Sequence, residues 1–203
     1  PVSASGAMGP NDFWNIDNGH RDRLGVFAEW ERHWNAQLTS VLGVRHTRVS
    51  TSTAPVQGYS SLPTWADDAA AFNTGHHKRN DSHWDVTAMA SYEPAKGRRY
   101  EAGVARKTRS PSLYERYPWS TNTMAAGMNN FLGDGNGYLG NPDLKPEVAH
   151  TLSGSASWED ATDPQRWGIT ASAHVTRIHD YVDAGRCPAS QCRSGNTTAD
   201  NEF

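Results

Sequence analysis

The chain has 203 residues and a formal net charge of −3, so it lacks the basic surface that nucleic-acid binding requires. Eight Trp and 18 Gly accompany only 36 % hydrophobic residues and a mean hydropathy of −0.75, a poor composition for an ordinary soluble core. No run approaches the roughly 20 apolar residues of a spanning helix, and no signal peptide opens the chain at Pro1, which predicts a mature or truncated polypeptide.

Alternation of apolar and polar residues predicts six β-strands. They lie at about residues 21–34, 37–52, 82–93, 99–110, 149–159 and 166–182. The third is the clearest, because Trp84, Val86 and Ala88 alternate with Asp85 and Thr87. Each strand is therefore expected to present one face to an apolar environment and the other to water.

The connections between these strands alternate in length. Residues 35–36, 94–98 and 159–165 are short turns, whereas 53–81 and 110–148 are long and rich in Gly, Asn, Pro and Ser. Tight periplasmic turns and extended extracellular loops are typical of outer-membrane barrels. The pattern predicts an all-β fold, namely part of an antiparallel transmembrane β-barrel, with a soluble β-sandwich as the alternative. Because a plugged transporter needs roughly 22 strands, residues 1–203 are expected to form only part of the barrel.

Large aromatic residues on the apolar side of the strands cluster near the short turns. They are Trp34, Tyr92, Tyr100, Trp158 and Trp167. Trp and Tyr favour the membrane interface, so the cluster predicts an aromatic girdle; the alternative is that they close the end of a soluble sandwich.

Three arginines interrupt the apolar side toward the opposite ends of the strands: Arg48, Arg106 and Arg177. A guanidinium is tolerated near the membrane interface, where it can meet lipid phosphates. Ordinary solvated strand ends are the alternative.

Two motifs flank the longest loop. The first reads Arg-Ser-Pro-Ser-Leu-Tyr-Glu at residues 109–115, and the second reads Gly-Asn-Pro-Asp-Leu-Lys-Pro-Glu at residues 140–147. In this order they resemble the C-terminal part of the β-barrel of TonB-dependent outer-membrane receptors. The residues that carry the resemblance are Arg109, Pro111, Ser112, Asn141, Pro142, Leu144, Lys145, Pro146 and Glu147. Since proline ends or avoids ladder pairing, we predict an architectural role for them rather than ligand binding.

The resemblance implies a receptor in the outer membrane of a Gram-negative bacterium. Such a receptor binds a scarce nutrient, for example a siderophore, another metal chelate or haem, and imports it with TonB-coupled energy. The implied partners are outer-membrane lipid and lipopolysaccharide, the small-molecule or metal-chelate ligand, and the TonB complex acting through a plug domain that this sequence lacks. Neither a resident cofactor nor enzymatic activity is expected. A passive porin and a secreted β-sandwich binding module are the alternatives.

The longest loop supplies the candidates for ligand binding. They are Tyr114, Tyr117, Trp119, Met124, Met128 and Phe131. Aromatic rings and thioethers are suited to a metal chelate or a hydrophobic ligand. Packing of the loop against itself is the alternative reading.

Other chemical motifs are weak. His76 and His77 are adjacent, and neighbouring histidines rarely point at one metal ion, so solvated loop histidines are the alternative. Cys187 and Cys192 enclose a short loop, which favours a disulfide over a metal site. Residues 133–137 lack the ligands of a calcium loop and predict a tight turn. Neither a serine-hydrolase elbow nor a His-Glu-x-x-His motif occurs, so no catalytic site is predicted.

Overall fold

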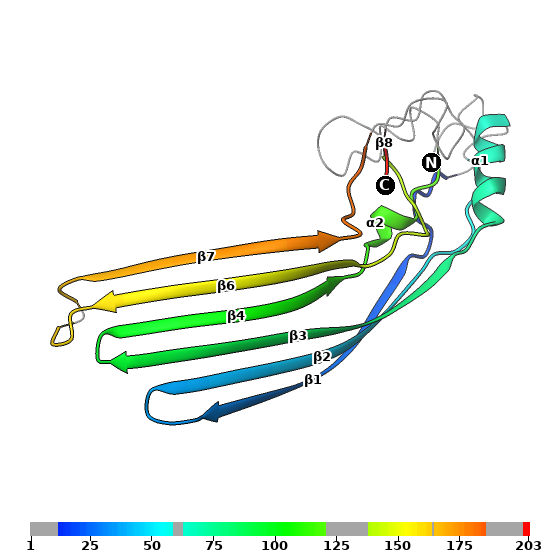
Figure 1. The fold of residues 1–203 in the computed structure, drawn as a ribbon. Helices are drawn as coiled ribbons and strands as arrows, with labels where there is room; N and C mark the ends of the chain where they lie inside the picture. The colour runs from blue at the N-terminus through cyan, green and yellow to red at the C-terminus, as the bar shows by residue number, and fades with distance from the viewer. Residues whose placement is uncertain (1–11, 59–62, 121–137, 164, 186–200) are drawn as a thin grey trace.

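A computed structural model describes residues 12–58, 63–120, 138–163, 165–185 and 201–203. Its main feature is one antiparallel sheet of six long strands, each hydrogen-bonded to the next long strand along the chain. In order they are β1 (His20–His33), β2 (Leu38–Ser52), β3 (Lys78–Ala95), β4 (Arg98–Arg109), β6 (Glu147–Glu159) and β7 (Gly168–His179). Figure 1 shows the short turns at one end of the sheet and the two helices at the other. The predicted all-β, antiparallel fold class is confirmed.

Four short elements lie outside this sheet. They are α1 (Pro63–Asn73), α2 (Leu113–Arg116), β5 (Tyr138–Leu139) and β8 (Asn201–Glu202), and the last two pair in parallel. Helix α1 occupies part of the connection expected to be a loop. Pro63 suits the first helical position, where no backbone N–H is needed, and residues 69–71 are consecutive alanines, which favour a helix. Within the described residues, neither helix is long and apolar enough to cross a membrane.

The strand register places most apolar residues of the six strands on one face of the sheet, with Phe27, Val41, Val49, Met89 and Ile178 as exceptions on the other face. Leu42 lies opposite Trp30 on one side and Ala88 on the other. The row then continues across β4, β6 and β7 through Val104, Leu152 and Val175. Leu152 and Val175 are 58 % and 64 % exposed. A β-sandwich would bury this apolar face under a second sheet, but its side chains are exposed, as lipid-facing residues of a barrel wall are in the absence of lipid.

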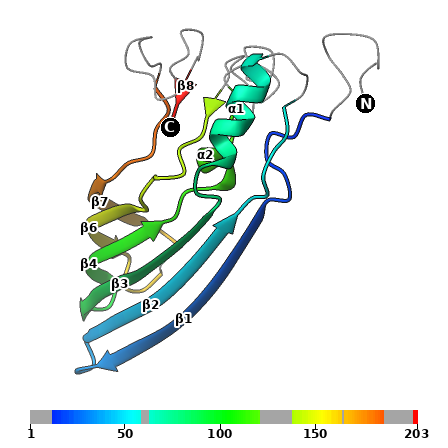
Figure 2. The same cartoon turned by 90° about the vertical axis from the view of Figure 1, so that its right-hand side faces the viewer.

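The opposite face of the sheet is polar, and the loop segments fold over it at one end. Its residues include Thr47, Thr51, Asp85 and Ser153, which alternate in the strands with the apolar set. Thr47 and Thr51 are almost completely buried. Figure 2 shows both helices at this end of the twisted sheet. In a barrel this face points inward, so the loop segments lie over the interior.

Side chains and one glycine fix the three short turns. Asn35 Oδ1 accepts hydrogen bonds from the backbone N–H groups of Gln37 and Leu38 between β1 and β2. Gly97, between β3 and β4, has a φ of 77°, which favours glycine, and a Cβ there would lie 2.5 Å from Glu159 O. Asp160 Oδ1 accepts hydrogen bonds from the backbone after β6. These turns account for the close spacing of the strand ends.

The five aromatic residues lie at this turn end. They are Trp34, Tyr92, Tyr100, Trp158 and Trp167, and all except the half-buried Trp158 are exposed. The Tyr100 and Trp158 rings meet edge to face, with 6.0 Å between centroids, and Trp34 Nε1 donates to Ser40 Oγ at 2.9 Å. An apolar ring with a satisfied polar tip is suited to a membrane interface.

Strand β3 differs from the sequence prediction at both ends. It begins at Lys78 rather than near residue 82, and it pairs with β2 as far as Ser52. The added residues are polar, so their hydropathy gave no strand signal, yet their backbones complete the ladder. At the other end the strand includes Pro94, where the pairing with β4 shifts register between Tyr92 and Ala95. The irregularity accommodates a residue that has no N–H to donate.

Candidate functional site at the loop end of the sheet

Arg116 ties helix α2 to the polar face of the sheet. Its side chain is 1 % exposed, and its Nη2 donates to both carboxylate oxygens of Asp81, at 3.0 and 3.1 Å. The same nitrogen donates to Leu144 O, and Nη1 donates to Thr51 Oγ1, each at 3.0 Å. One guanidinium therefore links β2, β3, α2 and the segment that leads into β6.

Tyr117 completes this buried link. The residue is fully buried, and its hydroxyl lies 3.1 Å from Thr51 Oγ1 and 3.2 Å from Thr51 O. Although Tyr117 was a candidate for ligand binding, no part of it is accessible to a ligand in this structure. A buried tyrosine needs a hydrogen-bond partner for its hydroxyl, and Thr51 supplies one.

The first sequence motif forms a capped turn with a shared arginine. Ser112 Oγ accepts from Glu115 N, while Glu115 Oε2 accepts from Ser112 N, which is a capping box. Arg109 Nη1 donates to both carboxylate oxygens of Glu115, at 2.9 and 3.0 Å, and its Nε donates to Glu147 at 2.5 Å. Arg109 thus joins the last residue of β4 to α2 and to the first residue of β6. Pro111 is buried beside this turn.

The second motif packs directly on the first. Gly140 N donates to Pro118 O and Asn141 N donates to Glu115 O, both at 2.8 Å. A Cβ at Gly140 would lie 2.5 Å from the backbone carbon of Arg116, so only glycine fits without displacement.

The rest of this motif reaches back to β3 and forms a turn of its own. Arg79 Nε donates to Pro142 O at 2.8 Å, and Arg79 also pairs with Asp143. Asn141 Oδ1 accepts from Asp143 N, which holds a tight turn. Pro146 is half-buried and Lys145 is exposed.

Electrostatics reinforce the Arg109 link. Arg109 and Glu147 lie three positions beyond Arg106, where the apolar face of β4 ends, so they are outside the membrane-spanning part of the strands. The hydrogen bond from Arg109, together with one from Val182 N, lowers the pKa of Glu147 below its ordinary value. Hydrogen bonding to Glu147 likewise raises the pKa of Arg109. Each group therefore stabilises the charged form of the other.

A small apolar core joins α1 to these motifs. Val56, Ala69 and Trp119 are buried together, with Phe13 and Phe72 packed against them. The Phe13 and Trp119 rings lie 5.5 Å apart, and Trp119 Nε1 donates to Trp14 O at 2.8 Å. The Asn73 side-chain amide accepts a hydrogen bond from Val56 N at 2.8 Å and donates one to Val56 O at 2.7 Å.

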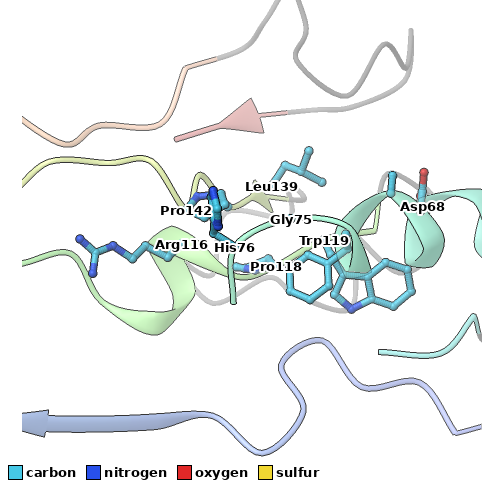
Figure 3. Close-up of a pocket in the computed structure, with 11 residues that line it drawn as sticks. Asp68, Gly75, His76, Arg116, Pro118, Trp119, Leu139 and Pro142 are labelled. Atoms are coloured by element: carbon cyan, nitrogen blue, oxygen red, sulfur yellow. The ribbon is translucent and has the colours of Figure 1, made fainter. Parts of the chain in front are cut away.

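A pocket of about 290 Å³ lies between α1 and the two motifs. Its lining is largely apolar and aromatic, and the lining residues with ionisable side chains are Asp68, His76 and Arg116. The other principal lining residues are Ala71, Phe72, Gly75, Pro118, Trp119, Leu139, Gly140 and Pro142. In Figure 3 the Arg116 guanidinium points away from the other labelled residues, toward its partners on the sheet. The arrangement suits an apolar or aromatic group held near one carboxylate and one imidazole.

The pocket includes only some of the residues that the sequence singled out. Trp119 lines it while also belonging to the loop core, whereas Tyr114 is 51 % exposed and is not among its lining residues. Met124, Met128 and Phe131 lie outside the described residues.

The weak metal candidates do not converge on one point. His76 is exposed at the pocket, while His77 stacks on Phe72 with 4.8 Å between ring centroids and its Nε2 lies 2.9 Å from Phe72 O. Within the described residues, no three His, Cys, Asp or Glu side chains are placed to hold a metal ion. Cys187 and Cys192 lie outside those residues.

Sequence reasoning missed the residues that hold the site together. The sequence placed Arg116 and Asp81 in the long connections and Thr51 at the end of a predicted strand, and it gave no reason to expect that they contact one another. Their position in the sequence was the one signal that could have indicated a role for residues 116–118, because they directly follow the first motif and continue its turn.

The comparison with known families agrees with this architecture. Residues 1–201 match the family described as TonB dependent receptor-like, beta-barrel. The chain belongs to this TonB-dependent receptor family. No curated protein and no solved structure matches it. The receptor's family consists of outer-membrane proteins of Gram-negative bacteria that act as transporters and receptors rather than as enzymes, and that interact with TonB and with small-molecule ligands.

Proposed function

We propose that this chain forms part of the barrel of an active-transport receptor, which binds a scarce nutrient at the cell surface and imports it with TonB-coupled energy. The observation that supports this best is that the described parts of the long connections fold over the polar face of the sheet and line a pocket at that end. A ligand bound there lies at the outer mouth of the barrel, above the interior through which it would pass.

The volume and lining of the pocket also limit the size and chemistry of the ligand group that can enter it. A volume of about 290 Å³ is at the lower end of the range for small-molecule sites, so it suits one arm of a ligand rather than a whole haem. Phe72, Trp119 and Leu139 offer apolar contact, and His76 offers an accessible nitrogen. A metal chelate with an aromatic arm fits this lining. Met124, Met128 and Phe131 stay predicted ligand contacts.

The two motifs have an architectural part in this proposal. Arg109 and Arg116 anchor the back wall of the pocket, formed by residues 116–118 and 140–142, to strands β2, β3 and β6. A fixed back wall keeps the pocket formed in the absence of ligand, which reduces the entropy lost on binding.

Uptake by cells that express the intact receptor tests the proposal. The probes are radiolabelled ferric catecholate, ferric hydroxamate and haem. Ala71→Trp fills the pocket, and Ala70→Trp, on an exposed neighbouring residue that does not line it, is the matched control. We expect saturable uptake of one probe, a raised half-saturation concentration in Ala71→Trp alone, and loss of uptake when TonB is deleted or the proton gradient is dissipated. Uptake that persists without TonB, together with a large steady conductance in planar bilayers, would instead identify a passive channel.

A further inference from the structure

The backbone ladder between β3 and β4 stops before either strand ends. Its last pair at the loop end is Val86 and Arg106, although both strands continue toward the loops beside their other neighbours. Beyond that pair, Asp85 Oδ1 accepts a hydrogen bond from Thr108 N at 2.8 Å, and Arg106 Nη1 donates to Trp84 O. Side chains therefore take the place of backbone hydrogen bonds where the two strands part.

Four residues of β3 face the polar side of the sheet at this end, and three of them bond to β4 or to the connection that follows it. In chain order the four are Arg79, Asp81, His83 and Asp85. The first donates to Pro142 O, the second accepts from Arg116, and the fourth accepts from Thr108 N. Within the described residues His83 makes no such bond, and its Nδ1 is buried without a hydrogen-bond partner. His83 is thus the gap in a row of side-chain links.

His83 is also a buried ionisable group between two carboxylates. Its side chain is 9 % exposed and lies directly opposite Thr47, whose hydroxyl is likewise buried without a partner in the described part of the chain. Asp81 and Asp85 lie two positions away on either side, about 7 Å along the strand. The other charged groups around the imidazole are Arg23 of β1, Arg45 of β2 opposite Asp85, Arg106 of β4, and Arg116 of α2 bonded to Asp81. A proton on His83 would therefore place a charge among groups that already hold the loops to the sheet.

Burial makes that proton unfavourable while the loops are closed. His83 lies three positions beyond Val86, the partner of Arg106, and so outside the membrane-spanning part of the strands. Removal from water lowers the pKa of His83 below its ordinary value, by more than the neighbouring Asp85 and Asp81 raise it. A histidine that becomes solvated as the loops open regains its ordinary pKa of about 6.5.

We propose that His83 is an acid-sensitive switch, which stays neutral while the loops are closed over the sheet and takes up a proton as they open. Above about pH 6.5 the imidazole is neutral in both arrangements, so it does not favour either. As the pH falls below that value the open arrangement binds the proton first, which shifts the equilibrium toward opening. Arg116 and Pro118 line the pocket, so acid loosens the wall that forms it.

Amide hydrogen exchange of the intact receptor in detergent, at about pH 7.5 and about pH 5.5, tests the switch. Exchange times are scaled for the effect of pH on the intrinsic exchange rate. We expect peptides that cover residues 106–110 and 113–118 to open severalfold more at the lower pH, relative to peptides at the short turns. A single proton on a group with an ordinary pKa of about 6.5 sets an upper limit of about tenfold. Glu147 stays ionised at both pH values because its pKa is lowered, so it does not contribute to the change.

Two variants assign the response to one histidine. His83→Gln has no proton to take up at these pH values, so its exchange should not rise between about pH 7.5 and about pH 5.5. The matched control is His76→Gln, because His76 is exposed at the pocket, and this variant should keep the full rise.

The contrary outcomes are distinct. A wild-type protein without an acid-specific rise would overturn the proposal, and this comparison needs no variant to fold. A rise far above tenfold would require more than one proton and would overturn the assignment to a single group. A rise that survives in His83→Gln, or that disappears in His76→Gln, would also overturn it. Since exchange is measured without ligand, the result does not depend on whether the receptor transports one.

Discussion

Replacing Arg116 with methionine tests the buried link between the loops and the sheet. Methionine keeps most of the apolar volume but removes the donors to Asp81, Thr51 and Leu144. Arg116 is 1 % exposed and Asp81 is 9 % exposed, so the change leaves a carboxylate buried without its cation. Loss of one partner of a buried pair costs about 3–5 kcal/mol, which predicts a rise in local opening of roughly a hundredfold to a few thousandfold.

Amide hydrogen exchange of the intact receptor in detergent measures this opening. Peptides that cover residues 113–118 and 140–147 should exchange faster, while the strands near the short turns should not change, because opening of the loops is local. Arg109→Met is the comparison variant: the Arg109 side chain is 47 % exposed, with Glu115 and Glu147 at 14 % and 12 %, so its loss should raise exchange less than the loss of the 1 % exposed Arg116. The double variant Arg116→Met, Asp81→Leu should recover most of the protection from exchange, since it leaves no buried carboxylate without a cation. Exchange in Arg116→Met within about threefold of the wild type, less than 1 kcal/mol, would refute the reasoning.

Three further predictions address the sheet, the motif contact and the pH response. Leu152→Arg on the apolar face should destabilise folding into lipid vesicles by about 2–4 kcal/mol, whereas Ser153→Arg on the polar face should have little effect; equal effects in urea titrations would contradict the assignment of faces. Gly140→Ala should increase protease cleavage of the loops because of its backbone clash, whereas the open Gly154→Ala should not, and identical digestion patterns would argue against the close contact. The lowered pKa of Glu147 means that its stabilising effect is complete above about pH 4.5 and is lost as the pH falls through the lowered value; thermal unfolding from about pH 6 to pH 3 should therefore show a smaller acid loss in Glu147→Gln than in the wild type.

The sheet was predictable because a membrane wall imposes a local rule on the sequence. Every second residue must be apolar, so Val104, Leu152 and Val175 could be assigned to the same face before their register was known. The short turns were visible as well, since Asp160 and Gly97 are residues that turns require. Polar strand extensions lack this signal, which is why the first residues of β3, from Lys78, were assigned to a loop.

The candidate site was much less predictable, because contacts distant in sequence define it. Strands β5 and β8 have two residues each and are joined across more than 60 positions, where the Tyr138 and Phe203 rings also meet at 5.7 Å. Nothing in the local sequence of either segment predicts that pairing. The same holds for Arg116, whose partner Asp81 lies 35 residues earlier. The motifs showed where the chain turns, but the burial of their neighbours depends on the whole loop assembly.

The two walls of the pocket differ in how firmly they are attached to the barrel. On one side, Arg116 donates charge-assisted hydrogen bonds to Thr51 of β2 and to Asp81 of β3, and such bonds are about twice as strong as neutral ones. On the other side, α1 packs against the apolar core, and Asn73 at its end makes neutral hydrogen bonds with Val56. A ligand that draws the walls together would therefore move α1 toward the motifs, since displacing the motifs would break a buried ion pair. We therefore expect the wall held by Arg116 to keep its position when a ligand binds, and α1 to adjust to the size of the ligand.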